Sequence, residues 1–519
     1  MYKYVIKNGT VIDGVAKNAY KHDIAISEGV VVGMGRNIPA KTAEKVIDAT
    51  GKFVVPGFID IQNHSDSYWT IFDQPSQVSM VSQGITTIVT GNCGSSLAPL
   101  AGRESIKTIQ KWHDLSGVNV NWASFEELGQ VIEQNRLGVN VASLVGHATL
   151  RRGLLGDQVR TVTEEEVKVM ERLLTKALDD GAFGLSMGLV YAHEVDSAVT
   201  ELLSLAKSLQ RHNKYLSVHL RSESEGILDA VDEAIDIGQR LEIPVKISHL
   251  KLRGKENWHL FDRLINKLEN AFHSGLDITF DVYPYSSAWS VLYTYLPKWA
   301  YEGGRAETLR RINSEKDRKK ILDFLRNQNY DYSNIRVATA EANNAFIGKT
   351  ILHIAANLGT SNEEALLKVL SSTKNQAIVF DNNLFDEHVE LLVSSPLSII
   401  ATDGAGYSRE GQSLVHPRCF GTMPKLLSMV REQKIMKWER AIAKITSEPA
   451  RLLGLKRRGR IAIDAFADLV VFDPDKIKDR ATFDQPFMFA DGIDQVFVNG
   501  GLAFENKQPD GLHGIFLKR

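Results

Sequence analysis

Residues that can bind a metal or move a proton stand at the ends of short apolar runs in the middle of the chain. Cys93 follows TTIVTGN, His219 ends YLSVH and His249 follows PVKIS. One thiolate and two imidazoles suit Zn²⁺, which accepts three protein ligands and keeps a fourth position for water. Further polar side chains hold equivalent places in other runs: His64, Asp66, His147, Arg221, Lys251, Tyr283 and Asp403.

Two of these residues allow more than one interpretation. Cys93 could be a small buried hydrophobic residue, but the segment GNCGSS around it is typical of a loop. Asp403 follows the apolar run LSIIAT, and a buried carboxylate there needs a metal, a cation or a proton-transfer role, because an unpartnered buried charge is costly. An Asp before Gly can equally cap a helix. Spacing alone leaves both roles of Asp403 open.

The elements that must position these residues alternate between strand and helix. Eight apolar runs lie between residues 56 and 404, and amphipathic helical segments separate several of them, one opened by the capping box from Thr163 to Glu166. Strand followed by helix implies right-handed crossovers and parallel strands. Eight such units predict an α/β fold with a (β/α)₈ TIM-type barrel, whose catalytic residues stand at the carboxyl ends of the strands. An open doubly wound sheet is the alternative, but the G-x-G-x-x-G expected after its first strand is missing.

Both ends of the chain have a different character, with short strands and turn signals such as Asn8-Gly9 and Asn499-Gly500. We therefore expect a small β-sandwich domain built from residues 1–55 and 450–519, flanking a barrel over residues 56–449. More than 100 residues separate the seventh and eighth runs, which is too long for a simple loop. The sequence predicts an inserted subdomain over about residues 288–345, placed to act as a lid.

Composition excludes several classes of protein. The 519 residues are 43% hydrophobic and 24% charged, which argues against disorder, and the net charge of −2 offers no general attraction to nucleic acid or membrane. Two cysteines cannot make a disulfide scaffold. The apolar stretch at the start of the sequence is too short for the hydrophobic region of a signal peptide. No apolar run is long enough to span a bilayer. We expect a soluble cytoplasmic enzyme with a small-molecule substrate; the sequence does not indicate its oligomeric state.

The motifs as a set resemble the N-acyl-D-amino-acid deacylase (D-aminoacylase) family of the amidohydrolase superfamily. PGFID and ADLVVFD are typical of the superfamily. Four further motifs together point to the deacylase branch: GNCG, HLRSE, HPR-x-x-GT and DRATF. The matching segments occur in the family's order across nearly the whole chain, with weakest coverage at residues 288–345: PGFIDIQNHSD, TTIVTGNCG, GHATLR, GAFGLSMGLVY, HLRSE, ISHLK, DVYPY, ATDG, HPRCFGTM, SEPARLLGL, ADLVVFDP, DRATFDQP and GIDQVFVNG.

The resemblance implies specific roles and a reaction. It implies a tightly held zinc on Cys93, His219 and His249, with Asp403 as the proton shuttle and His147 near the scissile carbonyl, although a structural role for His147 stays open. The implied reaction is zinc-dependent hydrolysis of N-acyl-D-amino acids. A metal lowers the pKa of its bound water and polarises the amide carbonyl, which fits that reaction.

The first metal-binding motif departs from the superfamily pattern. Superfamily members usually carry His-x-His here, whereas this chain has Gln62-Asn63-His64. Gln62 is a poor zinc ligand, so we expect one tight zinc, with a second site that is weak or absent and retains His64 and Asp403 alone. Tyr191 is a predicted substrate contact, but it is followed by Ala-His-Glu where the family tends to have Pro and Gly, which leaves that contact in doubt.

The substrate of such an enzyme carries an α-carboxylate as well as an amide. Arg221, Lys251 and Tyr283 are the cations and hydroxyl best placed to bind it, with surface or supporting roles as the alternative. Arg418, in HPRCFGT, is left open between a structural role and a gate. A cyclic-amide hydrolase like dihydroorotase or hydantoinase is the near alternative, but its usual bridging Lys is missing from AFGLSMG. A non-catalytic binding protein on the same fold is the third reading.

Overall fold

The computed structural model describes the chain except residues 103, 111, 114, 116–117, 157, 341–342 and 409–412. Among the described residues, a series of eight strands pairs in parallel in sequence order, with the short β11 (Val145–Gly146) continuing the third strand. A parallel bridge between Asn63 and Gly404 brings the last strand beside the first. The α/β class is confirmed. Each predicted run contributes one strand of the series, and the third run also holds β11: β8 (Phe58–Asp60), β9 (Ile85–Thr90), β10 (Asn140–Ser143), β12 (Gly184–Gly188), β13 (Tyr215–His219), β14 (Val245–Ile247), β15 (Ile278–Val282) and β19 (Ser398–Ile400).

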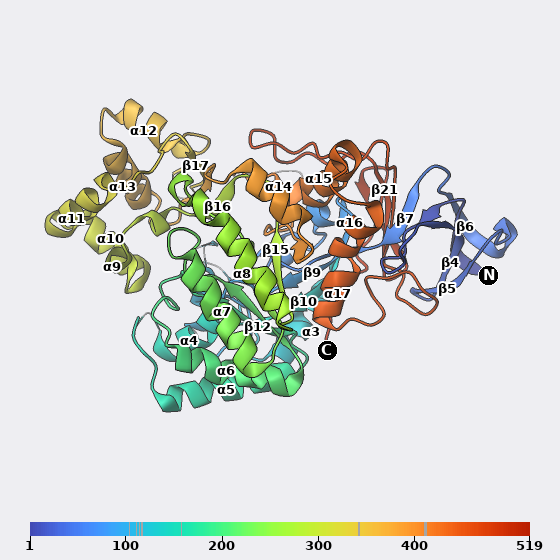
Figure 1. The fold of residues 1–519 in the computed structure, drawn as a ribbon, viewed down its shortest axis with the longest axis horizontal. Coiled ribbons are helices and arrows are strands. Elements are labelled where there is room, and N and C mark those ends of the chain that lie inside the picture. The colour runs from blue at the N-terminus through green and yellow to red at the C-terminus, as the bar shows by residue number, and fades with distance from the viewer. Residues whose placement is uncertain are drawn as a thin grey trace.

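Helices follow most of these strands and cover the outer face of the sheet (Figure 1). The predicted capping box is confirmed at α5 (Glu164–Asp179), where Thr163 and Glu166 each bind the other's backbone N–H. None of the described helices is long and apolar enough to cross a membrane. The other helices of this part are α1 (Thr70–Asp73), α2 (Val78–Val81), α3 (Phe125–Asn135), α4 (His147–Leu155), α6 (Val199–His212), α7 (Ile227–Leu241), α8 (Phe261–His273), α14 (Asp386–Ser394), α15 (Arg418–Gln433), α16 (Trp438–Ile445) and α17 (Ser447–Leu453).

Two sheets at one end of the molecule combine both ends of the chain (Figure 1). The first, in the order β5-β4-β1-β6, is N-terminal, whereas the second, β23-β22-β21-β20-β7-β2-β3, mixes both ends. They share one hydrophobic core in which Ile24 and Val31 from the start of the chain meet Leu469 and Phe497 from its end. The strands are β1 (Tyr2–Lys7), β2 (Thr10–Val11), β3 (Tyr20–Lys21), β4 (Asp23–Ser27), β5 (Val30–Gly35), β6 (Ala43–Asp48), β7 (Phe53–Pro56), β20 (Leu469–Phe472), β21 (Ile493–Val498), β22 (Gly501–Glu505) and β23 (Gln508–Pro509).

The last residues of the chain leave these sheets and return to the parallel strands. The N–H of Val141 donates to the carbonyl of Ile515 over 2.9 Å, and the N–H of Arg519 donates to Gly181 over 3.1 Å. Leu517 lies in the core between the parallel strands, together with Ile59 from β8. The expectation that all of residues 450–519 belong to the β domain therefore differs from the structure, because this apolar tail is buried against the other unit.

The inserted segment forms a small antiparallel sheet with its own helices, which project away from the terminal sheets (Figure 1). β18 (Ile378–Asp381) is the central strand and pairs with both β16 (Ala288–Val291) and β17 (Ile335–Thr339). Because β18 completes this sheet, the insertion continues well past the predicted end at residue 345. Its helices are α9 (Lys298–Tyr301), α10 (Gly304–Asn313), α11 (Glu315–Arg326), α12 (Ile351–Leu358) and α13 (Asn362–Ser372).

Candidate active site

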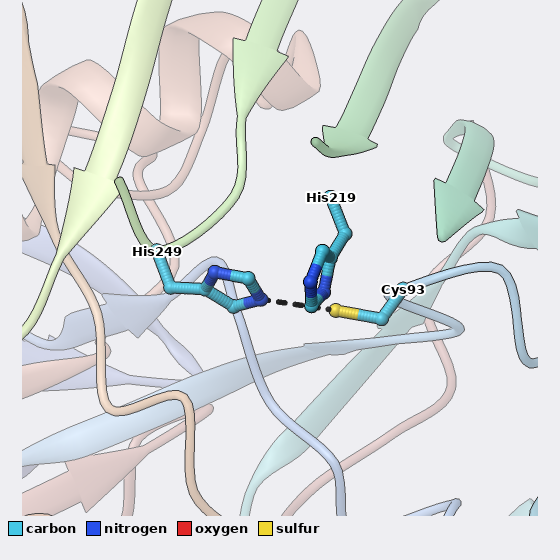
Figure 2. Close-up of side chains that lie close together, drawn as sticks. All are labelled: Cys93, His219 and His249. Atoms are coloured by element: carbon cyan, nitrogen blue, oxygen red, sulfur yellow. Dashed lines mark hydrogen bonds between the residues drawn. The ribbon is translucent and has the colours of Figure 1, made fainter. Parts of the chain in front are cut away.

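The carboxyl ends of the parallel strands bring the predicted chemical residues together. His219 is the last residue of β13, Cys93 lies in the loop after β9, and His249 follows β14. Their possible ligand atoms all lie within 4.8 Å of one another, and the Sγ of Cys93 is 3.4 Å from the Nε2 of His249 (Figure 2). Cys93 and His249 both adopt a positive φ, which non-glycine residues rarely do and which is typical of functional sites.

The cluster favours a thiolate. Burial alone would raise the pKa of Cys93, but the charge of His249 and hydrogen bonds from His219, His249 and His64 outweigh burial and hold this pKa well below its usual value. A buried thiolate beside two imidazoles is a donor set that matches Zn²⁺ in both softness and number. These three residues therefore fit a zinc ion that retains an open position for water or substrate.

A buried carboxylate stands beside this cluster. Asp403 Oδ1 lies 3.0 Å from the Nε2 of His64, and its Oδ2 lies 2.7 Å from the Nη2 of Arg418. Burial would raise the pKa of Asp403, but the positive charges of Arg418, His249 and His64 outweigh it and hold the pKa well below the usual range. Asp403 is thus kept ionised, which is the form that can accept a proton. It does not act as the N-cap of a described helix.

Gln62 stands where a second metal-binding histidine is usual in the superfamily, and it makes two hydrogen bonds there. Its Nε2 donates a hydrogen bond to the Sγ of Cys93 over 3.1 Å, and its Oε1 accepts one from the Nζ of Lys246 over 2.6 Å. Lys246 in turn forms a fully buried ion pair with Asp281. Because both ends of the Gln62 amide are satisfied, this side of the sulfur is held by a hydrogen bond.

A pocket opens over the cluster. Tyr283 and Arg418 line it, and the Tyr283 hydroxyl and the Nε and Nη1 of Arg418 are buried without a hydrogen-bond partner among the described residues. The guanidinium carbon of Arg418 lies 4.4 Å from the centre of the Tyr283 ring. Unsatisfied buried donors are rare in native proteins, and an anion in the pocket would satisfy these N–H and O–H groups. The sequence had left Arg418 open between a structural role and a gate, and the structure places it in the lining of this pocket.

Lys251 and Tyr191, two predicted substrate contacts, also line this pocket. The Nζ of Lys251 contacts the Oε1 of Glu223 at 2.5 Å and the Nδ1 of His249 at 2.7 Å, so it also orients the His249 ring. The ring of Tyr191 packs edge-on against His219. Glu223 was not predicted as a site residue. The available signal was its place in HLRSE, four residues after His219.

Two predicted site residues, His147 near the scissile carbonyl and Arg221 at the α-carboxylate, do not line the pocket. The Nδ1 of His147 lies 2.9 Å from Glu194, and its Nε2 lies 2.8 Å from Glu201. Both ring nitrogens are thus occupied in a fully buried network, because α4 begins at His147 and directs the ring into the protein. Arg221 makes a bidentate ion pair with Glu233 on α7, which directs it away from the cluster.

The buried network around His147 contacts the loop that carries Cys93. Glu194 Oε1 also accepts the N–H of Gly188 over 2.9 Å. A Cβ added to Gly94 would stand 2.1 Å from the Oε2 of Glu194, so the carboxylate packs directly on the backbone next to Cys93. His147 and Glu194 therefore support the loop that carries Cys93.

Comparison with known proteins agrees with this geometry. The amidohydrolase family model matches residues 45–278 and 413–504. The chain belongs to the amidohydrolase family. The unmatched middle of this amidohydrolase contains the inserted segment and the last parallel strand.

Two relatives of this amidohydrolase come from Alcaligenes xylosoxydans xylosoxydans. It is 31% identical to an N-acyl-D-glutamate deacylase, over 99% of this chain and 96% of the relative. It is 32% identical to an N-acyl-D-aspartate deacylase, over 97% and 92%. Among solved structures, the N-acyl-D-glutamate deacylase from Bordetella bronchiseptica, complexed with zinc and a phosphonate mimic of the tetrahedral intermediate, superposes over the full length of both chains with a TM-score of 0.84 at 28% identity.

Proposed function

We propose that this amidohydrolase is a zinc-dependent deacylase of N-acyl-D-amino acids. The observation that supports it best is the combination of the Cys93, His219 and His249 donor set with the ionised Asp403 and the empty donors of Arg418 and Tyr283 in one pocket. An amide and an α-carboxylate on one small substrate would satisfy both halves of this site. The relatives named for N-acyl-D-glutamate and N-acyl-D-aspartate act on such amides.

Cys93, His219 and His249 would hold one zinc. Bound zinc would lower the pKa of a water molecule and polarise the amide carbonyl. A second tight zinc is disfavoured because Gln62 donates to the sulfur that a second ion would share. His64 lies 3.9 Å from that sulfur and hydrogen-bonds to Asp403, so it serves to orient the carboxylate instead.

Asp403 is the proton carrier in this mechanism. Its carboxylate accepts a proton from the attacking water and then delivers it to the nitrogen of the leaving amine. His64 and Arg418 hold the carboxylate ionised and oriented before the reaction. In balance, water adds its hydroxyl to the acyl carbon, the C–N bond breaks, and the products are a carboxylate and a free D-amino acid.

The donors of Arg418 and Tyr283, with the charge of Lys251, bind the α-carboxylate. Charge-assisted contacts of this kind fix both distance and direction. With the carboxylate fixed at one end and the carbonyl fixed over the metal ligands, the substituents on the α-carbon can take one arrangement. The side chain of one enantiomer then points into open space and that of the other into the wall, which accounts for selection of the D form.

We also make proposals about the architecture of the chain. We propose that the eight strands close as a (β/α)₈ barrel, that the two terminal sheets form a β-sandwich, and that the inserted segment from residue 288 covers the catalytic face. The bridge between Asn63 and Gly404 and the shared core of the two sheets support this arrangement. Cys93 and Cys419 are both buried and neither forms a disulfide, which supports a cytoplasmic location.

The competing functions predict a different site. A cyclic-amide hydrolase with two bridged metals needs a lysine at the end of the fourth strand, and β12 has the sequence GLSMG. A binding protein without catalysis does not need an ionised, oriented Asp403. Metal analysis of the purified protein, together with a screen of N-acetyl- and N-formyl-D-amino acids, L-isomers and cyclic amides, tests the proposal. Hydrolysis of cyclic amides alone, or of no amide, would overturn it.

A further inference from the structure

The positive charges of the active-site pocket are already paired with negative ones. Among the described residues, three lysine or arginine side chains line the pocket. Each forms an ion pair with a carboxylate, at N–O distances of 2.5, 2.8 and 2.7 Å in this order: Lys251 with Glu223, Arg253 with Asp381, and Arg418 with Asp403. A substrate that carries several negative charges therefore meets no unpaired lysine or arginine in the described lining.

The two arginines of this lining keep a few buried N–H groups without a partner among the described residues. On Arg418 these are Nε and Nη1, which bind the α-carboxylate in the proposed mechanism, and on Arg253 the group is Nε. The charge of Arg253 is balanced by Asp381, which also accepts a hydrogen bond from the hydroxyl of Tyr295. A second carboxylate on the substrate would thus lose its water without gaining a cation of its own, which is unfavourable.

Aromatic rings bound the pocket beside the α-carboxylate site. The guanidinium carbon of Arg418 lies 5.6 Å from the centre of the Trp289 ring. Trp289 stacks on Tyr68 with ring centres 5.0 Å apart, and the centre of the Trp112 ring lies 5.5 Å from that of Tyr68. These three residues, the aromatic wall, all line the pocket. The α-carbon of the substrate is bonded to the carboxylate that Arg418 binds, so the substrate's side chain begins beside this wall.

We infer that the pocket selects D-amino acids with an apolar side chain, above all an aromatic one, over D-glutamate and D-aspartate. This inference rests on the proposed deacylase function, and it separates the chain from its relatives named for N-acyl-D-glutamate and N-acyl-D-aspartate. A phenyl or indole ring would bury its apolar surface against the aromatic wall, either stacked or edge-on. Trp289 lies on β16, so the inserted segment takes part in choosing the side chain.

The first test compares N-acetyl-D-amino acids as substrates of the zinc-loaded parent protein. The kcat/KM for N-acetyl-D-phenylalanine should exceed that for N-acetyl-D-glutamate at least about tenfold, the effect of burying one aromatic side chain. N-acetyl-D-glutamine should also be hydrolysed with a higher kcat/KM than N-acetyl-D-glutamate, because the two side chains have nearly the same shape and differ in charge. N-acetyl-D-alanine gives the reference value for a substrate whose side chain is too short to cover the wall.

The second test removes rings from the wall. Trp289→Leu and Tyr68→Leu should each lower the ratio of kcat/KM for N-acetyl-D-phenylalanine to that for N-acetyl-D-alanine about two- to tenfold, the effect of losing one ring contact. Zinc content should stay the same, because neither residue belongs to the donor cluster. The matched control is Trp258→Leu: Trp258 stacks on Phe385 with ring centres 4.6 Å apart and does not line the pocket, so the ratio should not change.

Three results would overturn the inference while leaving the deacylase function intact. The first is a kcat/KM for N-acetyl-D-glutamate or N-acetyl-D-aspartate that equals or exceeds the value for N-acetyl-D-phenylalanine; loss of that activity in Arg253→Gln would then make Arg253 the partner of the side-chain carboxylate. The second is equal kcat/KM for the glutamine and glutamate derivatives. The third is a phenylalanine-to-alanine ratio that survives both Trp289→Leu and Tyr68→Leu. Failure to hydrolyse any N-acyl-D-amino acid would instead refute the proposed function itself.

Discussion

Removing the Tyr283 hydroxyl tests the α-carboxylate site with little disturbance to the free protein. This hydroxyl is buried and has no hydrogen-bond partner among the described residues, so Tyr283→Phe breaks no contact of the resting protein. Leaving a polar group unsatisfied is itself costly, and the midpoint of thermal unfolding should therefore stay the same or rise slightly. Zinc content should also stay the same, because Tyr283 is not a member of the donor cluster.

The loss appears once substrate binds. A hydrogen bond to a charged group contributes about 1.5–3 kcal/mol, which corresponds to a decrease in kcat/KM of about 10- to 160-fold. Because the carboxylate is bound in both ground and transition states, most of this decrease should appear in KM. Steady-state release of the free amine from the best N-acetyl-D-amino acid measures it.

Tyr285→Phe is the matched control. Its hydroxyl is also buried and without a partner among the described residues, but Tyr285 does not line the active-site pocket that Tyr283 lines. Its kcat/KM should remain at the parent value. Equal effects of the two substitutions, or a Tyr283→Phe variant within twofold of the parent, would refute the assignment of this site.

Three further predictions follow from the same geometry. Asp403→Asn keeps the shape of the side chain but cannot carry a proton, so kcat should fall at least about 100-fold while zinc stays bound; near-normal turnover would leave Asp403 a structural residue. Glu194→Gln should lower the free energy of unfolding by about 1–3 kcal/mol in denaturant titrations without raising KM, since Glu194 supports His147 and the Gly94 backbone; a raised KM at unchanged stability would mean that this network contacts the substrate. Gln62→His should raise the metal content, measured by elemental analysis, from one toward two per chain, whereas two chelator-resistant metals in the parent would contradict the single-zinc proposal.

The sequence was most informative where chemistry follows strand geometry. Cys93, His219, His249 and Asp403 could be placed together because parallel strands end at one face, and the structure brings their side chains into one pocket. The capping box at Thr163 is a local signal, and it was predicted correctly for that reason.

Side-chain direction within loops and helix starts was beyond the sequence. His147 and Arg221 stand next to strand ends, yet local helix geometry and the carboxylates of Glu194 and Glu233 direct them away from the pocket. Arg418 lies at the start of a helix, far in sequence from Tyr283, and its place over that ring depends on long-range packing. The extent of the insertion depended on a strand pairing across nearly 90 residues, for which the sequence carries no local signal.

The most direct test of the central claim is the comparison of enantiomers. The parent protein, analysed for zinc, is given matched N-acetyl-D- and N-acetyl-L-amino acids, and release of the free amine is followed for both. We predict hydrolysis of the D-isomer alone by protein that holds one zinc per chain, and loss of that activity when the zinc is removed by a chelator. Equal rates on both isomers, or full activity without metal, would contradict the account.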